Sequence, residues 1–338
     1  QFTAAGKQMA GMELMSYQQG VLMGAVLIGI YVLIGGYAAV CWTDLIQGLL
    51  MLAVLITFPI YAVIQAGGFG AVGEALHRAN IDHWWVGGQG PTTASVGFAL
   101  TYFGFGLGYP GMPHSIIRFI TVRDEKEAAH AAWIGAIYGA LVLFGSASLG
   151  IAGRALVTGL ADAEQILPSF TATYFPPLLG GVILAAVSAA IMSTADSQLM
   201  MAASALVHDL FFMSFKQHTA PSGKVMTRAT RGVIALLCAL ALGLALMEAK
   251  VIDTMVLFAW GCLGAAFSPV VMLALYWERF NWQGAVTSFL VGPITVIIWQ
   301  LMGLSGSLHG LIPGTGLSLV AAVVVSMMTP PRVARPAH

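Results

Sequence analysis

Residues 182–200 read VILAAVSAAIMSTADSQLM, an apolar stretch that carries Ser193, Thr194, Asp196 and Ser197 within five positions. About 20 consecutive apolar residues span the hydrocarbon core of a bilayer. An ionisable side chain at membrane depth is costly, and it therefore marks a candidate functional site. Hydroxyl oxygens and one carboxylate on a single helical turn are suitable ligands for a small, hard cation such as Na⁺. The stretch predicts a membrane helix that forms part of a cation site.

The composition excludes a water-soluble globule. The chain has 338 residues, of which 58% are hydrophobic and only 8% are charged, whereas soluble domains carry about 25% charged residues. The formal net charge is 0, so the charge balance gives no indication of a nucleic-acid partner. The 3 cysteines form no CxxC pair, and we expect them to be small buried hydrophobes rather than metal ligands.

Apolar segments of membrane-spanning length recur along the whole chain. The connections between them leave no room for a soluble domain, so we expect residues 1–338 to form a single transmembrane domain. The fold class that follows is an all-α polytopic membrane protein with about nine transmembrane helices. The predicted spans are residues 20–40, 43–66, 95–117, 129–152, 177–205, 232–248, 254–276, 284–302 and 311–328.

The placement of Lys and Arg predicts the orientation, because cytoplasmic loops carry an excess of positive residues. One side of the membrane would carry four such residues, Lys7, Arg78, Arg154 and Lys250. The other side would carry ten, and we expect that side to be cytoplasmic and to include the C-terminus, with Gln1 outside. The ten are Arg118, Arg123, Lys126, Lys216, Lys224, Arg228, Arg231, Arg279, Arg332 and Arg335.

Span 95–117 contains a sequence that a continuous helix would tolerate poorly. Residues 104–114 read GFGLGYPGMPH, with three glycines at alternate positions and then two prolines. Both residue types interrupt helices, and transporters place broken helices at their binding sites near the bilayer midplane. The alternative is a kinked packing helix, or a helix end near the interface. Span 254–276 carries a weaker break at Ser268-Pro269, where a packing role and a hinge both stay open.

On a helix, Ala190, Ser193, Thr194 and Ser197 fall at i, i+3, i+4 and i+7, on one face, with Asp196 at its edge. The Ala190 carbonyl and the hydroxyls of Ser193 and Thr194 could supply three of the roughly five oxygens that a hard cation needs. The rest must come from another segment. The alternative is that the hydroxyls bond back to backbone carbonyls one turn earlier, although this would not neutralise Asp196.

Asp44 is a second acidic residue within an apolar segment. It lies near the start of span 43–66, and Gln47 follows it on the same helical face. Asp44 could be a second carboxylate that senses the cation, or it could simply favour the helix macrodipole near an N-terminus. No nucleophile elbow, phosphate-binding loop, HExxH or paired-carboxylate motif occurs in the sequence, so nothing in it indicates an enzyme.

Four segments of the chain resemble the sodium/solute symporter family, and within it the bacterial sodium/proline symporters. They read IGGYAAVCWTDLIQ at 34–47, GLGYPGMPH at 106–114, AAIMSTADSQL at 189–199 and FAWGCLGAAFSP at 258–269. The resemblance covers essentially the whole chain and implies part of a LeuT-type core, built from two inverted repeats of five helices. It also implies that the chain starts near the end of the third core helix. The preceding N-terminal helices would then be a missing segment, or would be supplied by another chain.

The resemblance also implies roles for individual residues. Proline symporters carry Trp at the position of Phe105, and commonly Gln at that of Met112, so another small carboxylate remains open as the solute. The residues implied are Ala190, Ser193 and Thr194 for Na⁺, then Asp44, Asp196 and Ser197 for a possible second Na⁺, and Phe105, Tyr109 and Met112 for the solute.

The activity that the resemblance implies is Na⁺-coupled secondary active symport of a small organic solute. The solute would be a proline-like amino acid or another small carboxylate. We expect a multi-pass protein of the plasma membrane (the bacterial inner membrane), with membrane lipid as its surroundings and a cytoplasmic C-terminus. The alternative that the sequence leaves is a symporter-like membrane domain that acts as a sensor.

Overall fold

The computed structural model describes residues 1–78, 104, 106–157, 159–160, 162–213, 222–247, 252–306 and 308–330. The regular elements within these ranges are all helices. The chain divides into two compact units. The first comprises Gln1–Asn80 and Glu125–Ile252, and the second comprises Ile81–Asp124 and Asp253–His338.

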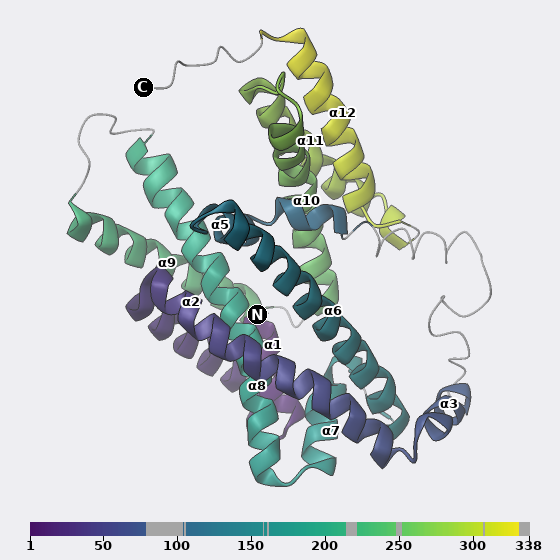
Figure 1. Ribbon diagram of the computed structural model, residues 1–338. Helices are drawn as coiled ribbons and strands as arrows, with labels where there is room; N and C mark the ends of the chain where they lie inside the picture. The colour runs from purple at the N-terminus through teal and green to yellow at the C-terminus, as the bar shows by residue number, and fades with distance from the viewer. Residues whose placement is uncertain are drawn as a thin grey trace. The chain divides into compact units, whose positions relative to one another are not determined.

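The first unit is a bundle of apolar helices (Figure 1). Its elements are α1 (Phe2–Gly11), α2 (Tyr17–Gln65), α3 (Phe69–Arg78), α6 (Glu125–Leu156), η2 (Ala163–Gln165), α7 (Ile166–Tyr174), α8 (Pro177–Ser204), the π-helical η3 (Ala205–Met213) and α9 (Gly223–Met247). Helices α2 and α8 pack against each other, and both also contact α1 and α9. The polar stretch that opened the sequence analysis therefore lies on a helix at the centre of this unit.

Helix α2 is broken at Gly36, which divides it into two membrane-spanning halves, Tyr17–Tyr37 and Val40–Gln65. The backbone angles of Gly36 are φ 66° and ψ 177°, a combination that is essentially restricted to glycine. The helix starts at a capping box, in which Ser16 Oγ accepts from the Gln19 backbone N–H and Gln19 Oε1 accepts from the Ser16 N–H. These features confirm the two separate spans predicted for this segment.

Two clusters of buried apolar side chains hold the first unit together. One joins Ile28 of α2 to Ile191 of α8 and Ile234 of α9. The other joins Phe58 of α2 to Phe170 of α7, together with residues of α6 and α8. Because lipid tails are as apolar as these side chains, close packing rather than exclusion of water stabilises such contacts within a membrane.

The second unit contains η1 (Tyr109–Gly111), α5 (Pro113–Ile120), α10 (Ile252–Tyr276, from Asp253 on), α11 (Trp282–Leu301), η4 (Leu304–Gly306) and α12 (Leu311–Met328). Helices α11 and α12 pack closely along their lengths (Figure 1). Small residues permit the close approach of helices in this unit. A Cβ atom added at Gly292 would lie 2.3 Å from the Ala265 carbonyl oxygen, and one at Gly284 would lie 2.1 Å from Ser326 Oγ.

Among the described residues, 8 helices are long and apolar enough to cross a membrane. They correspond to eight of the predicted spans. Their outer faces carry large exposed apolar side chains, such as Trp133 and Phe144 of α6, as expected for contact with lipid. The spans are Tyr17–Tyr37, Val40–Gln65, Glu125–Leu156, Pro177–Phe211, Gly223–Met247, Met255–Tyr276, Trp282–Leu301 and Leu311–Met328.

The remaining predicted span, 95–117, lies only partly within the described residues. Its described part is interrupted as predicted: the 3-10 turn η1 is followed by Met112 in an extended conformation (φ −83°, ψ 110°), and α5 then begins at Pro113. Proline suits the first position of a helix because no N–H is needed there. At Ser268-Pro269, where a packing role and a hinge both stay open, α10 continues through Pro269 to Tyr276.

Candidate functional site

Two side chains of α8 converge on one backbone oxygen. The Ser193 hydroxyl donates to the Ala190 carbonyl at 3.2 Å, and the Thr194 hydroxyl donates to the same carbonyl at 3.1 Å. The three oxygens thus gather on one turn of the helix, on the face that the spacing predicts. This geometry fits both a cation site and hydroxyls that simply bond back to the backbone. A hydroxyl that donates to a backbone carbonyl can also rotate so that its lone pairs face a cation.

Three oxygens from one helix do not complete a coordination shell for a hard cation, which needs about five or six. The Ala190 group therefore forms one side of a site. Ser193 and Thr194 are half-buried, so they are neither fully enclosed in the interior nor fully exposed on the surface of the unit. The arrangement can bind a small cation provided that another segment supplies the remaining oxygens.

Asp196, two residues further along α8, is completely buried, with 0% exposure. Its Oδ1 accepts a hydrogen bond of 3.3 Å from Ser197 Oγ. Its Oδ2 is buried and has no hydrogen-bond partner in the described part of the chain. A buried carboxylate oxygen without a donor is unfavourable, which favours a cation partner for Asp196.

The structure brings Asp44 of α2 into electrostatic range of Asp196 of α8. Two carboxylates that face each other in a medium of low dielectric constant repel. None of the described Lys, Arg or His residues forms an ion pair with Asp196. A cation between the two carboxylates would relieve their repulsion, so the pairing of Asp44, Asp196 and Ser197 that the sequence suggested is compatible with the geometry.

A further pair of hydroxyls beside Asp196 was not foreseen from the sequence. The hydroxyls of Tyr31 and Thr43 are hydrogen-bonded to each other, although 12 positions separate them. A continuous helix would place them about 18 Å apart. They meet because the chain turns at Gly36 between them. The Tyr31 hydroxyl also donates a hydrogen bond to the Asp196 carboxylate and interacts electrostatically with Asp44.

The predicted solute residues belong to the second unit. Tyr109 is 54% exposed, and its ring packs edge-on against Trp260 of α10, with 4.7 Å between the ring centroids. Met112 is only 1% exposed. Phe105 lies outside the described residues. Trp260 was not singled out from the sequence, although it lies in one of the segments that carry the family resemblance.

The interrupted segment packs closely on α10 through its glycines. The Ser268 hydroxyl donates to the Gly108 carbonyl at 3.3 Å. A Cβ atom added at Gly111 would lie 2.5 Å from Ser268 Oγ, and one at Gly108 would lie 2.6 Å from Trp260 Nε1. These glycines are therefore needed for close approach, which gives a physical reason for the glycine-rich sequence.

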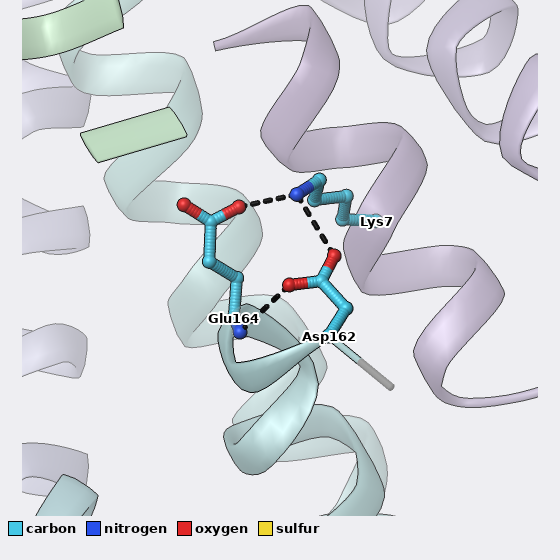
Figure 2. Close-up of polar contacts among 3 residues, drawn as sticks. All are labelled: Lys7, Asp162 and Glu164. Carbon is cyan, nitrogen blue, oxygen red and sulfur yellow. Dashed lines mark hydrogen bonds and ion pairs between the residues drawn. The ribbon is translucent and has the colours of Figure 1, made fainter. Parts of the chain in front are cut away.

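A third polar cluster lies elsewhere in the first unit and was also missed. Figure 2 shows Lys7 of α1 between the carboxylates of Asp162 and Glu164. Lys7 is 8% exposed, and its Nζ lies 2.8 Å from Asp162 Oδ2. The hydrogen bond from Lys7 holds the pKa of Asp162 below its ordinary value. The contact fixes the connection between α6 and α7 against α1.

Within the described residues, no group of three or more His, Cys, Asp or Glu side chains could hold a metal ion. The polar clusters of α2 and α8 combine hydroxyl, carbonyl and carboxylate oxygens instead. Such donor sets suit hard cations rather than transition metals.

Comparison with known protein families identifies one match that covers most of the chain. The model described as "Sodium:solute symporter family" matches residues 1–292. The osmoregulated proline transporter OpuE of Bacillus subtilis is 34% identical over 319 residues, which cover 93% of this chain and 64% of that protein. The sodium/proline symporter of Escherichia coli is 32% identical over 322 residues, which cover 93% of this chain and 63% of that protein. The chain thus spans just under two thirds of the length of these relatives.

A solved structure of a Na⁺-coupled sialic acid symporter, in a substrate-bound outward-open state, shares the fold. The TM-score is 0.78 at 20% sequence identity, and the match covers 97% of this chain and 72% of that one. The predicted fold class, an all-α membrane protein with part of a LeuT-type transporter core, is therefore confirmed.

Proposed function

Because the chain belongs to the sodium:solute symporter family, we propose that the protein performs Na⁺-coupled symport of a small organic solute across a membrane. The observation that best supports this proposal is the convergence of the Ser193 and Thr194 hydroxyls on the Ala190 carbonyl. It gathers three hard oxygens on a central helix of an otherwise apolar bundle. Proline transporters among the relatives support the same activity.

In the proposed mechanism, Na⁺ binds the carbonyl oxygen of Ala190 and the hydroxyl oxygens of Ser193 and Thr194. The two hydroxyls rotate so that their lone pairs, rather than their hydrogens, face the site. The remaining ligands come from another segment, for which the preceding N-terminal helices are the proposed source, either in the same chain or as a separate one. Binding of Na⁺ raises the affinity for the solute, and linkage requires the reverse effect to be equal.

We place a second Na⁺ between Asp44 of α2 and Asp196 of α8, with Ser197 as a neighbouring ligand. The buried Oδ2 of Asp196 and the repulsion between the two carboxylates support this site. Each Na⁺ that binds here would neutralise one negative charge within the membrane, where an uncompensated charge is costly.

The proposed solute site uses the interrupted segment that precedes α5. The exposed ring of Tyr109 is available for an apolar solute surface, and Phe105 and Met112 complete the proposed set. The burial of Met112 supports an indirect role, in which it shapes the segment behind Tyr109. Proline, a proline-like amino acid or another small carboxylate is the proposed solute class.

The 8 apolar helices and the symporter relatives make this a multi-pass membrane protein. We propose the bacterial inner membrane as its location, with lipid around the exposed apolar faces. The excess of Lys and Arg on one side supports a cytoplasmic C-terminus.

Uptake of labelled solutes into proteoliposomes with the full-length protein tests the proposal. We expect uptake of proline or a short carboxylate to require an inward Na⁺ gradient. The variant Ser193→Ala/Thr194→Ala should raise the Na⁺ concentration for half-maximal uptake at least tenfold. Thr295→Ala is a matched control, because Thr295 is also a half-buried residue of a membrane helix whose hydroxyl donates to the i−4 carbonyl, at 2.7 Å from Val291.

An unchanged Na⁺ dependence in the double variant would show that the site is wrongly placed. Specific solute binding without any uptake under a Na⁺ gradient would instead favour the sensor alternative.

A further inference from the structure

We propose that one face of α9 binds an anionic phospholipid, whose phosphate is held by Lys224, Arg228 and Arg231. These three side chains form what we call the basic face of α9. The proposal goes beyond the symport proposed above, which assigns no residue to this helix.

The three cations of the basic face lie side by side. They occupy positions i, i+4 and i+7 of α9, which places them on one side of the helix within about 10 Å of its length. All three are exposed. Like charges at these spacings repel, and the first turn of α9 has no acidic residue to offset them. A bound anion would relieve this repulsion.

The surrounding chain supplies little counter-charge to the basic face. Within the described residues, none of the three cations forms an ion pair. Asp209 is the only acidic residue in the sequence from 197 to 247, and its Oδ1 lies 2.7 Å from His208 Nδ1 in η3. Arginine binds phosphate through paired, charge-assisted hydrogen bonds, so a phosphate group is a suitable partner for this face.

The depth of the basic face corresponds to the level of the lipid headgroups. Residues 232–247 follow Arg231 without a charged side chain, and as a helix they are about 24 Å long. That length covers most of the hydrocarbon core, which is about 30 Å thick. Arg231 therefore lies where the hydrocarbon ends, and Lys224 and Arg228 lie further out. The placement of Lys and Arg assigns this side to the cytoplasm, where basic clusters attract anionic lipids.

The surface below Arg228 favours a lipid over a free phosphate ion. Gly232, Ala235 and Ala239 continue the line of Arg228 toward the membrane interior, and all three are exposed. A Cβ atom added at Gly232 would meet nothing within 4 Å, and Leu236 beside this strip is 59% exposed. A phospholipid bound at the basic face would lay an acyl chain along the strip, whereas a free phosphate would make no contact there.

The test measures the melting temperature of the full-length protein in detergent as phosphatidylglycerol is added, with phosphatidylcholine in parallel. We expect the larger rise with phosphatidylglycerol. The variant Arg228→Gln/Arg231→Gln should increase the phosphatidylglycerol concentration for half of this rise about thirtyfold, since each basic residue near an anionic surface contributes a factor of about five. The variant Arg228→Lys/Arg231→Lys keeps both charges and should shift this concentration by less than about threefold.

Lys126→Gln is the matched control, because Lys126 is also exposed at the start of a membrane helix but is flanked by Glu125 and Glu127. It should leave the response to phosphatidylglycerol unchanged. Inorganic phosphate at the same concentrations should give no comparable rise, and an equal rise would overturn the assignment to a lipid.

Equal rises with the two phospholipids would refute the site, as would equal responses of the wild type and Arg228→Gln/Arg231→Gln. Should the double variant not fold, Lys224→Gln at the end of the helix decides the question through an expected fivefold loss. None of these measurements involves Na⁺ or solute, so failure of the lipid site and failure of the proposed symport are distinguishable.

Discussion

Lys7 Nζ lies 2.8 Å from Asp162 Oδ2, so an amino group near the start of the chain is paired with a carboxylate between α6 and α7. The Lys7 side chain is 10% exposed and that of Asp162 is 34% exposed. Burial alone would favour a neutral Lys7. The two hydrogen bonds to Asp162 and Glu164 outweigh it and raise the pKa of Lys7. The pair therefore remains charged at neutral pH.

Replacing Lys7 by Met should lower the free energy of unfolding by about 1–2 kcal/mol. Breaking a fully buried pair costs roughly 3–5 kcal/mol, and the partial exposure of Asp162 reduces that value. Thermal unfolding in detergent measures the change. Arg78→Ala is the control, since the Arg78–Glu74 pair is 3.9 Å long and both side chains are more than 75% exposed; its loss should be close to zero. Equal effects of the two variants would contradict the structural role of Lys7.

The Lys7–Asp162 pair should also give a pH-dependent contribution to stability. Because the pKa of folded Asp162 lies below its ordinary value of 3.8, the stabilisation is fully present above that value. It is lost as the pH falls through the folded pKa. The difference in melting temperature between wild type and Asp162→Asn should therefore be constant from about pH 5 to 7 and shrink below pH 4. A difference that grows on acidification has the wrong sign for this assignment.

Gly36→Ala should destabilise the first unit by about 1–3 kcal/mol, because the φ 66°, ψ 177° conformation is essentially closed to other residues. The substitution should also separate Tyr31 from Thr43 and weaken Na⁺ binding. Gly29→Ala provides the comparison, because Gly29 lies in the same helix and an added Cβ there meets nothing within 4 Å. It should be neutral or stabilising. Melting curves with and without Na⁺ distinguish the two variants.

Gly111→Ala should reduce solute uptake by at least tenfold, because the added Cβ overlaps both the hydroxyl and the backbone nitrogen of Ser268, at 2.5 and 2.7 Å. The interrupted segment would then shift on α10 and displace Tyr109. Gly106→Ala is the matched control, since nothing lies within 4 Å of a Cβ there. Initial rates of uptake in proteoliposomes provide the measurement, and wild-type rates in Gly111→Ala would contradict the close packing.

Local periodicity predicted much of this molecule. Runs of apolar residues predicted the membrane helices. The i, i+3 and i+4 spacing predicted that Ser193 and Thr194 lie on one helical turn with the Ala190 carbonyl. The meeting of Tyr31 with Thr43 could not be predicted in this way. It depends on a single backbone conformation at Gly36, and glycine in an apolar helix more often serves close packing.

Contacts between segments far apart in the chain also could not be predicted from the sequence. Lys7 and Glu164 are 157 positions apart, and no pattern within either segment marks the other. Their partners become evident only when α1 packs beside the connection that follows α6. The burial of Met112 is a similar case, because a methionine beside two prolines fits a cavity wall and a packed interior equally well.

The shared acceptor of Ser193 and Thr194 has an energetic consequence for the proposed symport. A cation that takes these oxygens must displace two hydrogen bonds, each worth about 1 kcal/mol, which lowers its intrinsic affinity by roughly thirtyfold. Weak binding is an advantage for a transporter, because the ion must be released on the side of the membrane where its concentration is low. When the ion leaves, the Ser193 and Thr194 hydroxyls can donate to the Ala190 carbonyl again.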